Sequence, residues 1–554
     1  MRRALMILMF VTLTLSVNAK RVQRVQQRDS ITIFGRVLCE GKPLANIPVS
    51  DGVHIVKTDS LGRYAIASHK FQDVVFVITP SGYEPECNKR ILPRFWSLLR
   101  KKREVAEEHN FNLVKRDQRS HRIIFVSNLG LRNSNEDIQQ FKHRTIPAAR
   151  KVVEEVADST AVYTISVGNI SHCQFWYSRE FDVEDIISLV ATMRYPTMFY
   201  TSMGSLDNDG AVPGTGLTDY NAERHYVCNC GPKYYSMNIG DVHYIILDNA
   251  VFRNTPGKGN YPTEIVGKCN YDRFVTIDQL DWLRKDLALI EDKTTPIVVC
   301  MHNSAFKTNS RNRISKQFSK PEHVDSLTNC FAQFSNVHFV TAGTRDRRIS
   351  YPNELPNIVE HSVAPTSGDD WRSGNNGFAS INRWGVPAGF EVFDAVGKEL
   401  SWHHHTESGD TKDFRLYDMA EVGKFYHDNL DVQNLLREHP KTFINYNTKE
   451  FTKQIYINWW GNEKGAKLEV FEDNRPLRVR QVFQADPLHV VTSPTISNKT
   501  NRKNSRFQRN NSLHMFRVQR NSLNSVIRVR TTSPFGVVTE ETFVGSKIFS
   551  QHTK

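Results

Sequence analysis

From residue 120 onward, short apolar segments that read as strands alternate with segments that read as amphipathic helices. Residues 145–157 place Ala149, Val152, Val153 and Val156 on one helical face behind a Thr145 cap. Residues 276–287 begin with Thr276 and Gln279 at the spacing of a capping box. The strand segments are residues 122–128, 161–169, 196–204, 242–249, 296–303 and 337–343. This alternation predicts an α/β core built from layers of sheet and helix.

Two further regions flank this core in the chain of 554 residues. Residues 31–115 are short alternating runs separated by Gly, Asp and Pro, which predicts a small antiparallel β-sandwich. This stretch resembles the transthyretin-like or carboxypeptidase-regulatory module, which implies an accessory role. After residue 410 the helical signal fades and alternation returns, so we expect a β-rich C-terminal domain. The predicted division is 31–115, 120–405 and 410–554.

The N-terminus has the pattern of a secretory signal. Arg2 and Arg3 precede an apolar run over residues 4–17, and Val17-Asn18-Ala19 ends in the small residue that signal peptidases prefer. The run is too short to cross a bilayer. We therefore expect a signal peptide over residues 1–19, a periplasmic or secreted protein, and no membrane span.

Charge and cysteine content narrow the function classes. The formal net charge is +13, and arginines are frequent after residue 475. Such a surface attracts polyanions, but arginines spaced by apolar residues are more typical of the solvent side of strands, so nucleic acid is not the expected partner. Anions of the cell envelope fit equally well. The eight cysteines permit disulfides in an exported chain, and the sequence does not reveal their pairing.

Polar residues stand at the end of nearly every predicted core strand. Ligands bind beyond the carboxyl ends of strands in open α/β sheets, so these residues are the candidates for a site. They are Asn128, Asn169, Ser205 with Asp207, His302, and Thr344 with Arg345 and Asp346.

In order, the strand ends read Asn128-Leu129-Gly130, Gly168-Asn169, Gly204-Ser205-Leu206-Asp207, His302 and Gly343-Thr344-Arg345-Asp346. This series resembles the calcineurin-like metallophosphoesterase family, whose motifs are D-x-H, G-D, G-N-H-D, a lone H and G-H-x-H. The resemblance spans residues 120–405, and the flanking sequences look like the accessory domains of one exported bacterial branch. It implies a four-layer αββα core. It also implies two divalent cations that hold a phosphoryl group and generate a hydroxide nucleophile.

Most ligand positions of that family are substituted here. Asn128 and Asn169 stand where carboxylates belong, and Leu206 stands where a histidine would protonate the leaving group. Asp207, whose family role is to orient that histidine, is kept, and only His302 keeps its ligand type. Losing a carboxylate between two dications leaves their repulsion uncompensated. We therefore expect no catalytic residues and no cofactor.

The expected product of these changes is a binding protein of the cell envelope that holds a phosphate-bearing or other anionic ligand. Its cleft would be neutral to positive. The predicted cleft residues are Asn128, Asn169, Ser205, His302, Thr344, Arg345 and Asp346.

Several alternatives stay open at this stage. One is an active metal-dependent phosphoesterase whose unusual Mn, Fe or Zn centre uses His302, Asp346 and the asparagines. Another is a polyanion-binding module in the C-terminal domain. In the structural alternative, His302 is an ordinary hydrogen-bonded histidine, and Asp346 forms a surface ion pair with Arg345 or Arg347.

Overall fold

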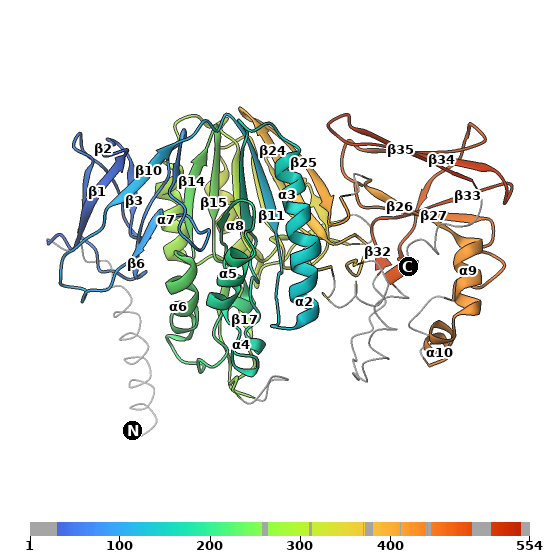
Figure 1. Cartoon of the computed structure of the whole chain (residues 1–554), viewed down its shortest axis with the longest axis horizontal. Helices are drawn as coiled ribbons and strands as arrows, with labels where there is room; N and C mark the ends of the chain where they lie inside the picture. Colours follow the sequence, from blue (N-terminus) through green and yellow to red (C-terminus); the bar gives the residue numbers. More distant parts are fainter. Residues whose placement is uncertain are drawn as a thin grey trace, which may run out of the picture.

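The computed structural model describes residues 30–257, 264–309, 313–368, 371, 380–409, 412–438, 440, 445–489 and 511–544. Three parts follow one another along the long axis of the molecule, from the blue N-terminal sheets through the green and yellow core to the orange and red C-terminal sheets (Figure 1). The predicted signal peptide, residues 1–19, lies outside the described residues. In the described part of the chain, no helix is both long and apolar enough to cross a membrane.

The N-terminal part is a β-sandwich, but its first sheet is mixed and not antiparallel as predicted, because the strand Ile33–Cys39 pairs in parallel with the strands Glu107–Glu108 and Phe111–Lys115. Its apolar side chains, including Ile33, Val49 and Phe111, are buried between two sheets because strand alternation turns one face of each inward. The first sheet has the path β2 (Lys42–Pro43), β1 (Ile33–Cys39), β10 (Phe111–Lys115) and β7 (Tyr83–Pro85), and β5 (Arg63–Ile66) and β9 (Glu107–Glu108) also pair with β1. The second has the order β4 (Ile55–Lys57), β3 (Pro48–Ser50), β6 (Val74–Val77) and β8 (Trp96–Leu98).

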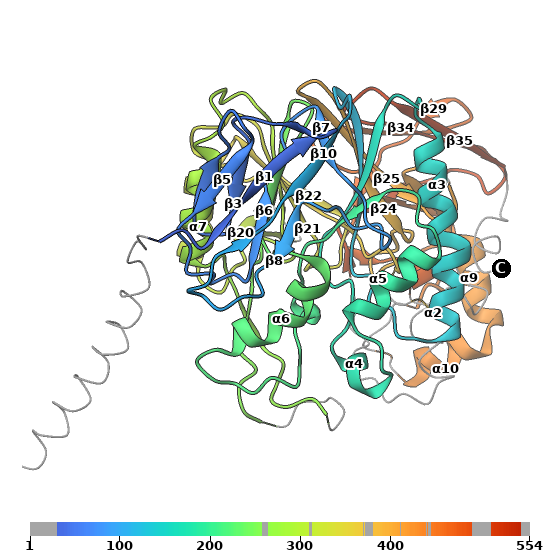
Figure 2. The same ribbon diagram turned by 60° about the vertical axis from the view of Figure 1, so that its left-hand side comes forward.

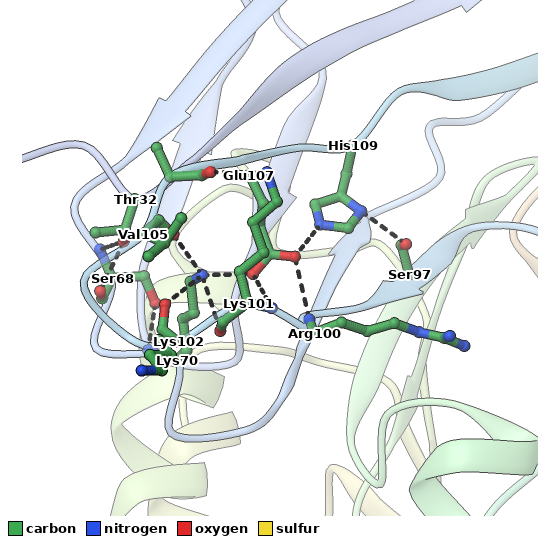
Figure 3. A network of polar contacts seen from close by, with 11 residues as sticks. Thr32, Ser68, Lys70, Ser97, Arg100, Lys101, Lys102, Val105, Glu107 and His109 are labelled. Atoms are coloured by element: carbon green, nitrogen blue, oxygen red, sulfur yellow. Dashed lines mark hydrogen bonds and ion pairs between the residues drawn. The ribbon is translucent and has the colours of Figure 1, made fainter.

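A buried ion pair holds the segment around residues 100–107 to this sandwich (Figure 3). The Lys70 ammonium pairs with the Glu107 carboxylate, and the two side chains are only 2% and 5% exposed. Lys70 also donates to the carbonyl of Val105 at 2.8 Å. Glu107 accepts from the backbone of Arg100 at 3.1 Å and faces the His109 ring at 3.2 Å. The pair is saturated with hydrogen bonds, which is the condition for burying such charges.

Two mixed sheets form the core, and each contains three of the six predicted strands. The first sheet has the order β13 (Met198–Tyr200), β12 (Ala161–Ser166), β11 (Ser120–Val126), β24 (Gly389–Val396) and β25 (Glu399–Thr406). The second has the order β14 (Tyr235–Ile239), β15 (Val242–Ile246), β18 (Ile297–Cys300), β21 (Val337–Thr341), β23 (Ile358–Ser362) and β22 (Arg348–Ser350). The strands β11, β12 and β13 are parallel, as are β15, β18 and β21.

The two sheets pack face to face, and helices cover their outer faces. One apolar cluster joins Phe125 and Tyr163 of the first sheet to Tyr244 and Phe339 of the second. A second cluster joins the other face of the first sheet to its helices. The result is the expected four-layer αββα arrangement, with α7 and α3 on opposite sides of the core in Figure 2. The helices around the core are α2 (Asn135–Gln140), α3 (Ile146–Glu154), α4 (Gln174–Ser178), α5 (Val183–Thr192), α6 (Thr218–Cys230), α7 (Ile277–Leu287) and α8 (Pro321–Thr328), with a π-helix (Phe141–Thr145) and 3-10 turns (Ser205–Asp207 and Asn329–Phe331).

Neither predicted helix cap makes the expected side-chain bond, although Thr276 is the N-cap residue of α7 as predicted. Thr145 lies inside a continuous helical run, because the π-helix leads directly into α3, and its hydroxyl donates to Glu407 at 2.6 Å instead of capping. Gln279 bonds the backbone of Asp248 on the neighbouring strand end, so it does not complete a box with Thr276. Tertiary partners have displaced the local ones in both cases.

Short hairpins lie at the margins of the core. They are β16 (Ala250–Phe252) with β17 (Tyr271–Arg273), and β19 (Phe306–Thr308) with β20 (Ile314–Lys316).

Within its described residues, the C-terminal part contains two four-stranded sheets and two helices. The helices are a correction to the expected loss of helical structure after residue 410. Asp418 caps α9 by accepting from Ala420, and Met419, Val422 and Tyr426 are buried at helical spacing. The helices are α9 (Met419–Asp428) and α10 (Leu430–Glu438). One sheet has the order β26 (Phe414–Asp418), β27 (Gln454–Trp459), β33 (Met515–Gln519) and β30 (Arg480–Gln481), and the other has the order β29 (Arg475–Pro476), β28 (Lys467–Glu472), β34 (Val526–Thr532) and β35 (Val538–Val544). The strands β31 (Gln484–Ala485) and β32 (Asn511–Ser512) form a separate small pair.

Both flanking parts are joined to the core by buried contacts. On the N-terminal side, the Trp282 indole of α7 donates to Ser50 at 3.0 Å and stacks edge-on with Phe76. On the C-terminal side, Arg347 pairs with Glu391 and donates to the carbonyl of Trp460.

Candidate functional site

The carboxyl ends of parallel strands from both core sheets meet at one edge of the core. Asn128 and Asn169 follow β11 and β12 of the first sheet, and His302 follows β18 of the second. The two facing sheets thus bring residues far apart in the chain to one place, as expected for the ends of parallel strands.

Three of the predicted residues are in direct contact. The Asn169 side-chain amide donates to Asn128 Oδ1 at 3.1 Å and lies 3.0 Å from His302 Nε2. The Asn128 amide donates in turn to the carbonyl of Ala342 at 3.2 Å. All three side chains are buried. We call Asn128, Asn169 and His302 the amide–imidazole group.

The hydrogen bonds assign the His302 tautomer. Nδ1 lies 3.1 Å from the carbonyl of Val167, which can only accept, so Nδ1 carries the proton and Nε2 accepts from Asn169. Burial, together with the charge of Arg345, lowers the pKa of His302 to about 4, although the hydrogen bond to Val167 acts in the opposite direction. The ring is therefore neutral at physiological pH.

The backbone at these strand ends is tightly constrained. Asn128 and Asn169 have left-handed φ angles of 48° and 52°, which asparagine tolerates better than most residues. Gly168 has φ 79°, and a Cβ there would lie 2.8 Å from His302 Nδ1. A Cβ on Gly204 would lie 2.3 Å from the backbone nitrogen of Asn169. Both glycines are required because another chain segment passes where a side chain would stand.

The 3-10 turn Ser205–Asp207 packs against this group. Leu206 donates its backbone N–H to Asn169 Oδ1 at 2.9 Å. Asp207 accepts from the backbone and the hydroxyl of Ser171, both at 2.8 Å, and from the backbone of Gly204 at 2.8 Å. Burial raises the pKa of Asp207 to about 6 despite these bonds. Ser205 is buried beside them. Asp207 thus fixes the loop beside the amide–imidazole group.

Thr344 and Asp346 are engaged elsewhere. The Thr344 hydroxyl bonds the Ser362 hydroxyl at 2.5 Å. Asp346 is buried, and the Arg383 guanidinium donates to both of its oxygens at 2.7 and 2.9 Å. The prediction that Asp346 forms a surface ion pair with Arg345 or Arg347 is therefore wrong, because this carboxylate is buried and pairs with Arg383. Arg347 bonds Glu391.

Arg345 lies between these two groups of residues. Its backbone N–H donates to the same Ala342 carbonyl that Asn128 uses, at 3.0 Å, and its φ is 57°. Burial, together with the charges of Arg345 and Arg132, lowers the pKa of His172 to about 4. The charge of Arg345 thus lowers the pKa of both His172 and His302.

Sequence reasoning did not identify His172, Ser171 or Arg383. Ser171 and His172 lie two and three residues after Asn169 in the chain, so their position after a strand end was a usable signal. Arg383 is 37 residues from Asp346, and no local pattern connects the two.

The donor set at this edge does not suit a binuclear metal centre. Among the residues that the structure describes, no three His, Cys, Asp or Glu side chains gather as they would around a metal ion. The amides and the imidazole bond one another, and the carboxylate of Asp346 is paired with an arginine. Neutral amides neutralise no cation charge.

Comparison with known families gives two matches at the two ends of the chain. Residues 31–116 match the family model described as "N terminal of Calcineurin-like phosphoesterase", and residues 360–538 match "C terminal of Calcineurin-like phosphoesterase". The chain belongs to the calcineurin-like phosphoesterase family. This membership agrees with the four-layer core and with the order of the strand-end motifs.

Solved structures of two phosphatases and one hydrolase are similar to parts of this chain. A dimetal phosphatase from Danio rerio has 8% identity and a TM-score of 0.33, with 52% of this chain and 96% of that chain covered. A purple acid phosphatase from yellow lupin has 13% identity and a TM-score of 0.33, with 52% of each chain covered. The phosphopantetheinyl hydrolase of Mycobacterium tuberculosis has 11% identity and a TM-score of 0.24, with 44% of this chain and 89% of that chain covered. A search among curated proteins found no match.

Proposed function

We propose that this member of the calcineurin-like phosphoesterase family is a metal-free binding protein for a phosphate-bearing or other anionic ligand. The amide–imidazole group forms the floor of the site, and Arg345 on the rim supplies the positive charge that the family's cations would provide. In this proposal the chain does not catalyse hydrolysis.

The contact between Asn128, Asn169 and His302 carries the proposal. Each donor and acceptor of the Asn169 side chain is used inside the protein, by Asn128, His302 and Leu206. A dication placed among these groups would have to break those bonds and would gain no negative charge in return. An anion bound next to this group would leave those hydrogen bonds intact and would be attracted by the charge of Arg345.

His172 adds a donor to the rim. Its Nδ1 accepts from the backbone of Gln174 at 3.3 Å, so the proton of the neutral ring is on Nε2. A neutral N–H together with a guanidinium is a suitable pair for phosphate oxygens.

The ion pairs of the C-terminal part favour the cleft over a polyanion-binding surface. Arg520 pairs with Asp418, and both Arg528 and Arg530 lie against Glu540. These cations are partly neutralised on the protein itself, which weakens their attraction for a polyanion.

Calorimetric titration with inorganic phosphate in the presence of EDTA tests the proposal. We expect phosphate to bind chelator-treated wild-type protein, and Arg345→Gln to weaken the affinity by about tenfold or more, because charge-assisted hydrogen bonds are lost. Arg119→Gln is the matched control, since Arg119 precedes β11 at the opposite end of that strand. It should leave the affinity unchanged.

The enzyme alternative has a distinct outcome. Stoichiometric Mn, Fe or Zn in the purified protein, together with hydrolysis of a generic phosphodiester that a chelator abolishes, would replace this proposal with a metal-dependent phosphoesterase.

The location is tested separately. Expression of the full chain should give a mature protein that begins at Lys20 and is recovered from the periplasm or the medium, as the signal-type N-terminus predicts.

A further inference from the structure

A cavity of about 420 Å³ lies between the N-terminal sandwich and the core, and it shares no lining residue with the strand-end site. One wall comes from β6, β8 and the residues next to them, and the other comes from α6 and the segment after it. Figure 2 shows α6 below the blue strands β6 and β8. Small-molecule sites have volumes of roughly 300 to 1,000 Å³ and are common at boundaries between domains. The size and the place of this cavity therefore suit a small ligand.

One part of the cavity wall is apolar. Val74, Phe76, Val227 and Tyr234 line it, and all four are buried. The Tyr234 ring is fixed in place, because its hydroxyl donates to the Gly52 carbonyl at 2.6 Å. A wall of this kind contributes affinity for a hydrocarbon group by removing its surface from water.

Two arginines line the cavity, one from each of the two parts. Arg100 belongs to the sandwich and Arg224 to α6, and both residues are exposed. The Arg100 side chain points away from the Lys70–Glu107 network, which uses only its backbone N–H (Figure 3). The Arg224 guanidinium lies over the Tyr220 ring, 5.7 Å from its centroid. In the described part of the chain, neither guanidinium forms an ion pair with a carboxylate.

One carboxylate in the same lining also has no cation as a partner. Asp73 accepts from the Tyr220 hydroxyl at 2.5 Å, and no Lys, Arg or His among the described residues forms an ion pair with it. Its backbone is held at φ 55°, and its carbonyl accepts from Leu99 at 2.8 Å. The other carboxylate, Glu223, is neutralised because Lys233 donates to both of its oxygens at 2.6 Å. The lining therefore carries unpaired charges of both signs.

We propose that this cavity binds a zwitterion with an apolar body, which is the chemistry of apolar amino acids and dipeptides. The ligand carboxylate lies against Arg100 and Arg224, its ammonium group against Asp73, and its side chain against the apolar wall. Guanidinium groups match carboxylates in geometry and form charge-assisted hydrogen bonds with them. A ligand with only one sign of charge would leave either the carboxylate or the arginines without a partner.

Such a ligand bridges two parts of the molecule. Asp73 and Arg100 belong to the sandwich, whereas Arg224 lies on α6 of the core. The hydrogen bond between Tyr220 and Asp73 already crosses this boundary. A ligand that binds only when the two parts are packed together raises the stability of the folded chain.

Calorimetric titration of the full chain with leucine and with leucyl-leucine tests the proposal. We expect at least one of the two to bind, and the tighter one indicates how far apart the two ligand charges lie. That ligand is then compared with its N-acetylated form, which lacks the ammonium group, and with its C-terminal amide, which lacks the carboxylate. Each capped form should bind about tenfold more weakly or worse, because charge-assisted hydrogen bonds are lost. No binding of either ligand, or equal affinity for capped and uncapped forms, would overturn the proposal.

Variants assign each end of the ligand to its partner. Asp73→Asn should weaken the uncapped ligand about tenfold and leave the affinity for the N-acetylated form unchanged. Arg224→Gln should weaken the uncapped ligand to a similar extent and leave the affinity for the amide unchanged. A variant that had merely lost its fold would bind none of these forms. Arg36→Gln is the matched control, since it removes an exposed arginine from β1 in the other sheet of the sandwich. It should change none of the affinities.

Thermal unfolding provides a second readout. A saturating concentration of the uncapped ligand should raise the melting temperature by a few degrees in the wild type and in Arg36→Gln. The same concentration should raise it less in Asp73→Asn and in Arg224→Gln. An equal rise in all four proteins would show that the ligand binds elsewhere, and the proposal would be wrong.

Discussion

At the scale of single residues, the site has a strained backbone at its strand ends, although asparagines replace the carboxylates that bind metal ions in the family. Asn128, Asn169 and Arg345 all have φ between 48° and 57°. Each such residue costs about 1 kcal/mol or more and persists only when its surroundings fix it. Here the hydrogen bonds of the amide–imidazole group and the Ala342 carbonyl do so. The geometry of the strand ends therefore does not depend on bound cations.

The buried His302 ring should make stability depend on pH. Its pKa is about 4 in the folded protein against an ordinary value of 6.5. Between pH 6.5 and 4, His302 binds a proton in the unfolded chain but stays neutral in the folded protein. The free energy of unfolding therefore falls as the pH drops through this range. At pH 5 this residue should contribute about 2 kcal/mol less to the free energy of unfolding than at pH 7. Urea titrations of wild type and His302→Gln should show a shallower pH dependence in the variant, and identical dependences would contradict this reading.

Gly168→Ala should disrupt the site sterically. The added Cβ would meet both His302 Nδ1 and the Gly204 Cα, at 2.8 and 2.9 Å. We expect a loss of about 2 to 4 kcal/mol, more than the conformational cost alone. Gly130→Ala is the control, since φ there is 45° and the nearest atom is 4.0 Å away. It should cost only about 1 kcal/mol. Equal losses in thermal unfolding would show that the close approach has no energetic weight.

The sequence revealed part of this site and concealed the rest. Asn128, Asn169 and His302 were found because each follows a buried strand directly, and strand ends converge for topological reasons. The setting of Asp346 could not be found, because Arg383 reaches it from a distant segment. Which residues follow a strand is local information, whereas the partner of a buried charge is set by the packing of the whole fold.

At the scale of elements, the buried Arg347–Glu391 pair joins the two core sheets and the C-terminal part. Arg347 just precedes β22 of the second sheet, and Glu391 lies on β24 of the first. Their side chains are 4% and 2% exposed. His514, the residue before β33 in the C-terminal part, contacts the Arg347 carbonyl through Nε2 at 2.7 Å. Removing only one partner of such a buried ion pair lowers the stability strongly, because the other charge stays buried without compensation.

Arg347→Met should therefore be strongly destabilising. It would leave Glu391 buried without its cation, at a cost of about 3 to 5 kcal/mol. Arg284→Met is the control, because Arg284 pairs with Asp281 at 2.6 Å on the exposed face of α7. That change should cost less than about 1 kcal/mol. Denaturant midpoints of the two variants should differ clearly, and a similar shift in both would contradict the prediction.

The strands were easier to predict than the helix ends and the pairings. Six core strands were recognised because they are apolar runs that end at Gly or a polar residue. Thr145 and Gln279 were assigned as caps from local spacing, but Glu407 and Asp248 compete for them in the folded chain. The helix α9 was missed although its buried residues have helical spacing, since the strands after it dominated the composition.

At the scale of the whole molecule, the contacts of Trp282 join the N-terminal sandwich to the core. Its indole bonds Ser50, and its ring contacts Phe76 and Tyr234. A bridge between Thr79 and Met237 adds backbone pairing across the same boundary. An apolar junction of this kind makes the two parts unfold together.

Trp282→Ala should separate the unfolding of the sandwich from that of the core. Scanning calorimetry of the wild type should show one main transition for these two parts, and the variant should show two. Phe331→Ala is the control, since Phe331 is fully buried within the core and contacts Phe339. It should lose a similar free energy, about 4 kcal/mol, without splitting the transition. Splitting in both variants would contradict the role given to Trp282.

The central strand of the first core sheet has a partner that is synthesised much later. Arg122 of β11 bonds Asp394 of β24, and 272 residues separate the two in the chain. A ribosome adding 5 to 20 residues per second needs roughly 15 to 55 s to make that stretch. Throughout this interval one hydrogen-bonding edge of β11 stays uncovered, and an uncovered edge recruits strands from other chains. We therefore expect the nascent chain to be prone to aggregation until β24 (Gly389–Val396) has emerged.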